Sequence, residues 1–350
     1  MRMLNSILEN SMINRLAAGL PRSPMQVNRI HESDAEILTI PGHEGTPLAL
    51  TTDTVAEEIA SGLYAEPWLI GWMTVMVNLS DLAAVGARAL GLVIAETLPP
   101  DATEGFLQEL QRGIADACRA CDTYILGGDT NSGPSLSMTA CALGLCEGDR
   151  TLSRLGCSPG DLVFASGPLG GGSTYAYARM TGSPLPPYRP VARLREGAFL
   201  RSFATCCMDT SDGLLATLDQ LMRLNGVGFT LDPGWESALT EDSRALARHL
   251  EVPAWVVVAG EHGEFELVFT LPAEDTDKFL SAAGSLGWSP VPLGHVTTDR
   301  QIRVSSGEKG IVSLDTAAVR NCADLARRDV RAYLEALRQL AGAQQGATRS

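Results

Sequence analysis

Apolar and polar positions follow two different periods along the chain, which predicts strands alternating with helices. Residues 34–40 and 47–52 have the composition of short strands, and the turn-forming segment PGHEG lies between them. The very apolar run 67–86 and the run 104–120, where apolar side chains recur at helical spacing, are expected to be helices. Further strands are expected at 89–98, at 123–130, where the strand should run into a glycine turn, and at 136–148.

The second half of the chain repeats this alternation after a segment, 148–160, that concentrates glycine, proline and charge. Such a segment predicts a domain boundary. Beyond it, strands are expected at 161–167, 206–209 and 264–272, and helices at 211–224 and, as one long arginine-bearing helix, at 317–341. We therefore expect an α/β or α+β fold, with an N-terminal domain at 1–148, a C-terminal α/β domain at 149–310, and a C-terminal helix and tail at 311–350.

Composition and charge narrow the possible partners. The chain has 350 residues, enough for two domains, and a formal net charge of −14. An acidic surface repels polyphosphate backbones, so nucleic acid is not an expected partner. The same charge would repel ATP unless divalent cations neutralise a group of carboxylates.

No membrane partner is expected either, because no apolar run is long and uninterrupted enough for a transmembrane helix. The first 23 residues have the pattern of an amphipathic helix rather than of a signal peptide. Eight cysteines occur without the second C-x-x-C or histidine pair of a zinc site. We expect reduced, buried cysteines and a cytoplasmic protein.

Several aspartates stand beside small or polar residues, near the ends of predicted strands or inside a helix. They are Asp53 in LTTD, Asp81 in NLSDLAA, Asp129 in GGDT, and Asp209 and Asp212 in MDTSDG. An isolated aspartate of this kind is usually a turn or helix cap, and Ser211 could likewise cap a helix starting at residue 212. Asp81 differs, because an unpaired carboxylate inside an apolar helix is costly. Carboxylates that converge on one place favour a bound cation such as Mg²⁺.

A glycine-rich segment, GPLGGGS at 167–173, follows a predicted strand and precedes a helix, a context that suits phosphate binding. It lacks the lysine of a Walker A loop and does not match the dinucleotide-binding pattern, so it is a weak signal alone.

The motifs LTTD, NLSDLAAVGA, GGDT, SRLGCSPGD and MDTSDG occur in an order that resembles thiamine-monophosphate kinases. That family belongs to the superfamily of aminoimidazole ribonucleotide synthetase, selenophosphate synthetase and a hydrogenase-maturation protein. The resemblance covers roughly residues 30–300. It implies a two-domain fold in which N-terminal strands of two subunits join into a β-barrel across a homodimer, and an enzyme that uses ATP and Mg²⁺.

The resemblance also implies roles for single residues. The Mg²⁺ ligands would be Asp34, Thr51, Thr52, Asp53, Asp81, Asp129, Asp209 and Asp212. The nucleotide-binding residues would be Gly128, Asp129, Arg154 and Ser211, and the residues central to catalysis would be Asp53, Asp129 and Asp212.

The chain departs from the family pattern where the family binds its phosphoryl acceptor. Ala60 replaces a histidine, Met73 replaces a lysine, and Gly263 replaces a glutamate. An arginine-bearing helix replaces the family's aromatic C-terminal motif. The resemblance therefore implies that the nucleotide-binding residues are kept and that the acceptor-binding residues are changed. His262 lies in the changed segment and could serve the acceptor, although a lone loop histidine is usually incidental.

Three functions remain open on the sequence alone. The first is a kinase that transfers the ATP γ-phosphoryl group to a small-molecule acceptor, with Arg154 steadying the triphosphate. The second is an enzyme that activates an amide or carbonyl oxygen with ATP before condensation. The third is a non-catalytic relative that binds nucleotide or only dimerises.

Overall fold

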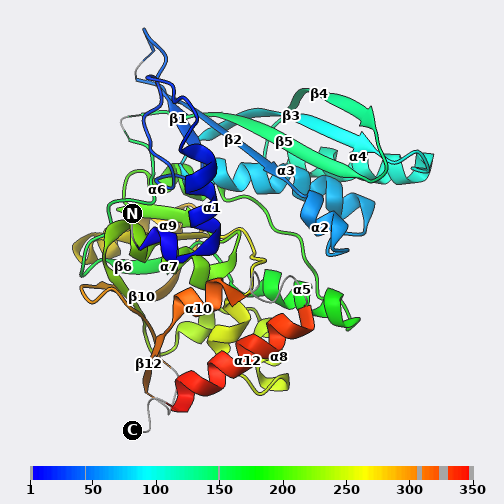
Figure 1. Ribbon diagram of the computed structural model, residues 1–350. Helices are drawn as coiled ribbons and strands as arrows, with labels where there is room; N and C mark the ends of the chain where they lie inside the picture. The colour runs from blue at the N-terminus through cyan, green and yellow to red at the C-terminus, as the bar shows by residue number, and fades with distance from the viewer. Residues whose placement is uncertain (1–2, 44, 149, 306–309, 323–329, 347–350) are drawn as a thin grey trace.

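Two β-sheets carry the fold, one in each half of the chain (Figure 1). The computed structural model describes residues 3–43, 45–148, 150–305, 310–322 and 330–346. Mixed α/β architecture is therefore confirmed. Within the described residues no helix combines the length and the apolar composition that crossing a bilayer requires.

The first sheet has five strands in the order β1-β2-β5-β3-β4. All neighbouring pairs are antiparallel except β3 and β4, which are parallel. Its strands are β1 Glu36–Leu38, β2 Leu48–Thr54, β3 Arg88–Leu98, β4 Ile125–Ser132 and β5 Ser137–Leu145.

Two long helices, α3 (Pro67–Ala84) and α4 (Glu104–Ala120), cover one face of this sheet (Figure 1). Every residue of α3 from 71 to 80 is buried, because the helix lies between the sheet, α4 and the second half of the chain. Gly71 and Gly113 allow α3 and α4 to approach closely, since a methyl group on Gly71 would lie 2.1 Å from the Leu110 carbonyl oxygen. The short helix α2 (Ala56–Ala60) follows β2.

The second sheet has seven strands in the order β12-β11-β8-β10-β6-β9-β7. Its strands are β6 Leu162–Ala165, β7 Cys206–Asp209, β8 Gly228–Leu231, β9 Leu267–Leu271, β10 Val291–Thr297, β11 Ile302–Ser305 and β12 Ile311–Leu314. The helices of this half are α5 Gly171–Thr181, α6 Leu194–Leu200, α7 Gly213–Asn225, α8 Glu241–His249, α9 Thr276–Ser285, α10 Thr316–Arg320 and α12 Val330–Gly346.

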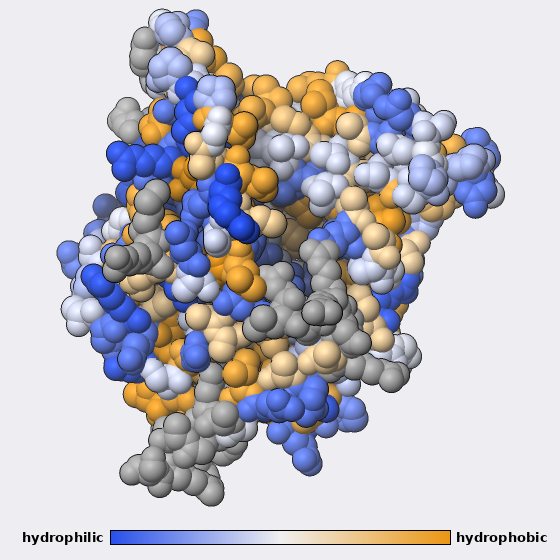
Figure 2. Space-filling view, in the orientation of Figure 1, coloured by the Kyte–Doolittle hydropathy of each residue, from blue (hydrophilic) through white to orange (hydrophobic). Residues whose placement is uncertain are grey.

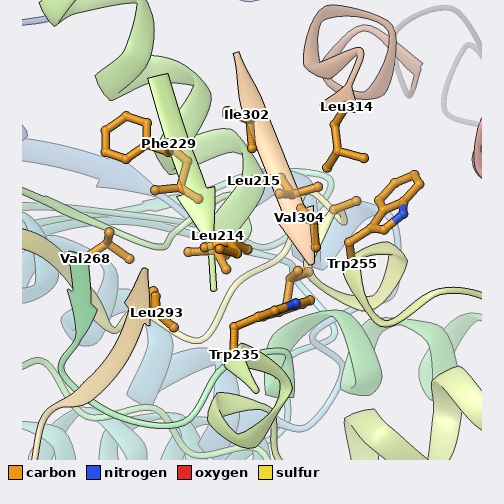
Figure 3. Close-up of a cluster of buried hydrophobic side chains, with 14 of the residues drawn as sticks. Leu214, Leu215, Phe229, Trp235, Trp255, Val268, Leu293, Ile302, Val304 and Leu314 are labelled. Carbon is orange, nitrogen blue, oxygen red and sulfur yellow. The ribbon is translucent and has the colours of Figure 1, made fainter. Parts of the chain in front are cut away.

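The core of the second half forms where α7 packs on this sheet. Figure 3 shows Leu214 and Leu215 of α7 facing strand residues such as Phe229 and Leu293, with Trp235 and Trp255 at one side. These side chains are at most 2% exposed, so they fix α7 and the residues before it relative to β7.

The N-terminal helical pattern is confirmed by the short helix α1 (Leu8–Ala17), which follows a 3-10 turn. Two other local expectations were wrong. The strand predicted at 123–130 does not end in a glycine turn, because β4 continues through Gly127 and Gly128 to Ser132 and is held by its pairing with β3. The segment beyond 310 begins with strand β12, and α10 and α12 are separate helices where one helix at 317–341 was expected; residues 323–329 lie outside the described part.

All eight cysteines are free thiols, and six of them are buried, as expected.

Candidate active site

A cluster of three carboxylates lies where the two halves of the chain meet. Asp34 precedes β1, Asp81 lies in α3, and Asp209 ends β7, yet one carboxylate oxygen of each lies within 4.8 Å of the others. We call this group the carboxylate cluster. One oxygen of Asp34, Oδ2, is buried and has no hydrogen-bond partner in the described part of the chain. Crowded carboxylates with an unpartnered buried oxygen form a donor set that suits a hard divalent cation.

The TTD segment of β2 lies beside this cluster. The Thr51 hydroxyl donates to Asp81 Oδ2 at 2.5 Å, and the backbone N–H of Asp53 donates to Asn78 Oδ1 at 3.0 Å. Asn78 belongs to α3 and is fully buried, so it fixes β2 against the helix that carries Asp81. Asp53 is therefore oriented toward α3 and the carboxylate cluster.

The raised pKa values of the aspartates show that bringing these carboxylates together is unfavourable. Burial, and secondarily the charge of Asp34, raises the pKa of Asp53 to about 6, although a hydrogen bond with Asp81 opposes the change. Burial also raises the pKa of Asp81 well above its usual value, and the charges of Asp53 and Asp209 add to this effect. Burial and then Asp34 raise the pKa of Asp209 to about 7. Without a cation, the folded chain resists full ionisation of this site.

Arg154 supplies the positive charge nearest to Asp34. Its Nη2 donates to Asp34 Oδ1 at 2.8 Å, and its backbone N–H donates to the Glu32 carbonyl oxygen at 2.9 Å. Burial alone would lower the pKa of Arg154, but the charge and hydrogen bond of Asp34, with the charges of Asp209 and Asp81, together outweigh it and the pKa is raised. The Arg154 Nε is buried without a partner among the described residues. This N–H is a donor that an anionic ligand placed beside it would satisfy.

Asp209 and Asp212 flank the start of α7. The Ser80 hydroxyl donates to Asp209 Oδ2 at 2.5 Å, which links β7 to α3. The helix begins at Gly213 with Asp212 as its N-cap residue, so Ser211 does not cap it as the sequence suggested. Burial raises the pKa of Asp212 to about 6, and the charge of Glu9 on α1 adds to this. The Asp212 side chain makes no capping hydrogen bond, which leaves it open to other ligands.

Asp129 lies apart from the cluster. The register pairs Asp53 with Ala140, Ala140 with Ile94, and Ile94 with Gly128, so three strand spacings, roughly 14 Å, separate β2 from β4.

The two aspartates also lie on opposite faces of the first sheet. Asp129 accepts a hydrogen bond from Asn131, two residues away, and shares its face with that residue. Thr130 donates instead to Glu96 on the other face. Thr52 also lies on the outer face, with its hydroxyl bonded to the Ala140 carbonyl oxygen. Asp129 and Thr52 therefore do not join the carboxylate cluster of their own chain.

A cavity of about 560 Å³ lies beneath β4, between this strand and α4. Its polar side includes Glu96, Thr130 and the backbone of Gly128, and its apolar side includes Ile114 and Tyr124. A cavity with one apolar wall and a few polar groups can hold a planar ligand.

The glycine-rich segment 167–173 is already bound by a carboxylate of the same chain. Glu264 Oε2 accepts from the Gly170 N–H at 2.8 Å, at the start of α5. Burial raises the pKa of Glu264 to about 8, although the Gly170 hydrogen bond opposes the change. Because Glu264 occupies this helix N-terminus, the segment does not present it freely to a phosphate.

The positions where the chain departs from the family pattern differ in exposure. Met73 is fully buried in α3 and Ala60 is exposed at the end of α2.

A group of aromatic side chains surrounds His262, beyond α7. His262 is 9% exposed, its Nε2 lies 3.4 Å from the Tyr64 hydroxyl, and its ring contacts Tyr64, Tyr175 and Tyr188. Burial lowers the pKa of His262 to about 4, so its imidazole is neutral at physiological pH.

Three residues that organise the site were not singled out from the sequence. Asn78 fixes β2, Ser80 binds Asp209, and Glu264 binds the glycine-rich segment. Asn78 and Ser80 belong to the NLSD motif, so their signal was present beside Asp81. Nothing in the sequence pairs Glu264 with Gly170, 94 residues away.

The sequence of the chain is similar to those of known proteins. Residues 32–146 match the family model "AIR synthase related protein, N-terminal domain". Thiamine-monophosphate kinase of Escherichia coli strain K12 is 32% identical over 305 residues, which cover 83% of this chain and 91% of that protein.

Solved structures of similar fold include thiamine-monophosphate kinase from Stenotrophomonas maltophilia K279a. It is 28% identical, with a TM-score of 0.67, over 85% of this chain and 96% of that one. A structure of AaThiL complexed with AMPPCP and TMP has a TM-score of 0.69 at 22% identity, over 84% of this chain and 91% of that one, and shows the shared fold.

Proposed function

Because the chain belongs to the thiamine-monophosphate kinase family and is an ATP-dependent kinase, we propose that it transfers the ATP γ-phosphoryl group, with Mg²⁺ bound, to a small-molecule acceptor. Family membership favours this function over the other two that the sequence left open. Those were amide or carbonyl activation and a non-catalytic role.

The observation that carries the proposal is the carboxylate cluster. Oxygens of Asp34, Asp81 and Asp209 lie within 4.8 Å of one another, and Asp34 Oδ2 is buried without a partner in the described chain. These residues would hold Mg²⁺ together with ligands from Thr51, Asp53 and Asp212. Bound Mg²⁺ would neutralise charge on the phosphate oxygens during transfer.

The chain's own residues would bind and orient the nucleotide. Arg154, with its buried unpartnered Nε, would donate to the triphosphate while its Nη2 stays on Asp34. Ser211 lies between Asp209 and Asp212 and would contact the nucleotide from the loop before α7. Gly128 has no side chain to block an approach to β4, where the cavity under that strand would take the base. The described geometry supports a fixed phosphate site with a separate base site.

We further propose that a homodimer completes this site and supplies Asp129 and Thr52 in trans. In a single chain these residues lie on the outer face of the first sheet, away from Asp53. That face exposes Leu50, Val93 and Leu126, and Figure 2 shows apolar residues along this upper edge of the molecule. Burial of this surface against a second copy, with the strands of both copies closing a barrel, would bring Asp129 to the partner's carboxylate cluster.

The acceptor would differ from that of the relatives. Side chains that the family pattern places around its acceptor are absent at Ala60 and Gly263, and Met73 is buried in the core. We propose a small molecule that is bound beside α7 and His262, near the aromatic residues of this region.

The proposal is tested by ADP release with Mg²⁺ and a panel of acceptors that includes thiamine monophosphate. Asp53→Asn and Asp129→Asn should each abolish turnover, whereas the matched surface variant Asp101→Asn should keep it. Mixing the two inactive variants should restore roughly a quarter of the activity, because half of the re-formed dimers would carry one intact site. Full activity in both variants would refute the Mg²⁺ site, and absence of recovery would refute only the shared site.

A further inference from the structure

One segment without regular structure joins α5 to α6 and crosses from the second half of the chain onto α3. It comprises residues 183–192, which we call the strap, and it contains four prolines. Within the described chain, residues 184–192 make no backbone–backbone hydrogen bond. A proline-rich segment of this kind is already extended, so it can move without breaking a strand ladder or losing much entropy.

The end of the strap is anchored, since Pro190 and Ala192 are buried and the Ala192 N–H donates to Met76 Sδ at 3.5 Å, and side-chain contacts hold the rest in place. Arg189 lies over the ring of Trp72, with 4.2 Å between its Cζ and the ring centroid, and the Trp72 indole N–H donates to the Pro190 carbonyl oxygen at 2.7 Å. Tyr188 points the other way, into the protein. Its hydroxyl donates to the Gly263 carbonyl oxygen at 2.9 Å, and its ring stacks on Tyr175 with centroids 4.6 Å apart.

The place that Tyr188 fills lies directly beside the loop that carries Asp209 and Asp212. The Gly263 N–H donates to the Ser211 carbonyl oxygen at 2.8 Å. A methyl group on Gly263 would lie only 1.6 Å from the Thr210 carbonyl oxygen, so the two backbones are in contact and no side chain fits between them. The Tyr188 hydroxyl is therefore separated from the phosphate site by a single layer of backbone.

Tyr188 satisfies groups that would otherwise bind a ligand. Its ring lies between Tyr175 and His262, whose ring centroid is 5.2 Å away, and its hydroxyl donates to the Gly263 carbonyl oxygen. His262 is neutral, and the hydroxyl of Tyr175 is taken by the Leu63 carbonyl oxygen. A molecule that replaces the Tyr188 side chain must be planar and aromatic, and it must carry an N–H or O–H donor.

We propose that the strap is a removable cover and that Tyr188 determines acceptor specificity by occupying the place of the acceptor's ring, from which the group to be phosphorylated would extend past residues 210–213 toward the carboxylate cluster. When the strap lifts, an uncharged aromatic ring with a hydrogen-bond donor stacks on Tyr175, donates to the Gly263 carbonyl and lies beside His262. This inference rests on the proposed kinase function, since it assigns the acceptor side of the same site. It makes Tyr188 an internal competitor of the acceptor.

The test measures binding without ATP, so that it does not depend on turnover. We would titrate the full chain with 4-aminopyrimidine, a planar ring with an N–H donor, by calorimetry. Tyr188→Ala should bind this probe at least roughly tenfold more tightly than the unaltered chain, because the competing phenol is gone. Leu185→Ala, a change on the exposed side of the strap, should bind like the unaltered chain.

Hydrogen exchange provides the second measurement. In the unaltered chain the probe should speed the exchange of the Trp72 indole N–H, which donates to the Pro190 carbonyl oxygen of the strap, and should decrease deuterium uptake at 260–264. Equal weak binding by Tyr188→Ala and the unaltered chain, with unchanged exchange of the Trp72 indole N–H, would overturn the proposal. If the unaltered chain releases no ADP in the kinase assay but binds the probe as predicted, this result would count against the kinase function alone.

Discussion

The carboxylate cluster and the aromatic group around His262 lie on opposite sides of the loop before α7, and they differ in how well each is satisfied. In the first, three carboxylates crowd together and Asp34 Oδ2 has no partner in the described chain. In the second, the Tyr188 and Tyr175 hydroxyls bind backbone carbonyl oxygens and the rings stack. The first site has the donor groups for a cation, whereas the second is closed by the chain itself.

This difference indicates which of the two regions has groups that a bound ligand would stabilise. Burial and then the charge of Asp34 raise the pKa of Asp209 to about 7, although Ser80 and Arg154 oppose the change, and a bound cation would offset the remaining cost. In the aromatic group the Tyr188 and Tyr175 hydroxyls already have hydrogen-bond partners, so a ligand there must displace a side chain of the protein. On our proposal the phosphate site is therefore already formed, while binding of the acceptor would require the strap to move.

The largest expected effect comes from neutralising the first site. Asp81→Asn should lower ATP turnover by roughly a thousandfold, because a Mg²⁺ ligand is lost while Thr51 keeps a hydrogen-bond acceptor. The same change should raise the unfolding temperature of the metal-free protein, because it removes the cost of burying a carboxyl group beside the charges of Asp53 and Asp209. Steady-state kinetics and calorimetry check both. A lowered metal-free unfolding temperature would mean that the cluster is not under strain.

The second effect concerns the backbone contact between the two regions. Gly263→Ala should destabilise the protein by about 3 kcal/mol, because the new methyl group would clash with the Thr210 carbonyl oxygen at 1.6 Å. Chemical denaturation measures the change. The control is Gly284→Ala, where a methyl group meets nothing within 4 Å and a helix gains a better helix former. Equal stability of the two variants would show that the regions are not in direct contact.

A third effect is the pH dependence of the metal-free protein. The pKa values of Asp53, Asp209 and Asp212 are raised to about 6, 7 and 6, above their unfolded value, so the folded state holds extra protons. This contribution to stability is present below the unfolded pKa and is lost as pH rises from about 4 to about 7.

Added Mg²⁺ should therefore raise the unfolding temperature more at about pH 8 than at about pH 5, because it binds the ionised carboxylates. Scanning calorimetry at both pH values checks this. Tyr188→Ala, a change in the aromatic group, should keep the same Mg²⁺ response. A Mg²⁺ shift that does not depend on pH would separate cation binding from these aspartates.

The smallest effect is expected at the strap. Arg189→Ala should cost about 0.5–1 kcal/mol, the usual value of an exposed cation–π contact, while it leaves the Tyr188 contacts in place. Chemical denaturation measures the cost, and exchange of the Trp72 indole N–H, which donates to the Pro190 carbonyl oxygen, should become faster. No change in this exchange would show that Arg189 does not hold the strap.

Much of the fold follows from local pattern. The helix expected at 104–120 is α4, Glu104–Ala120, because its apolar stripe faces α3 and no other element competes for it. The pattern was misleading at β4, since glycines that favour a turn locally are held in a strand by pairing with β3. Likewise α10 and α12 are separate helices, although their residues share one helical pattern.

The site was predicted in part, because motif order identifies residue types but not sheet faces. Asp34, Asp81 and Asp209 come together across 175 positions of the sequence, as the resemblance implied. The register of the first sheet puts Asp129 on the face opposite Asp53, which no single strand reveals. The role of Tyr188 was not foreseen, because its partners lie in α5 and beside α7.

The most direct test of the central claim is anomalous scattering from crystals of the full chain soaked with Mn²⁺ and a non-hydrolysable ATP analogue. Our account predicts a Mn²⁺ peak coordinated by Asp34, Asp81 and Asp209 together. A peak bound elsewhere, or clear nucleotide density with no metal between these three carboxylates, would contradict it.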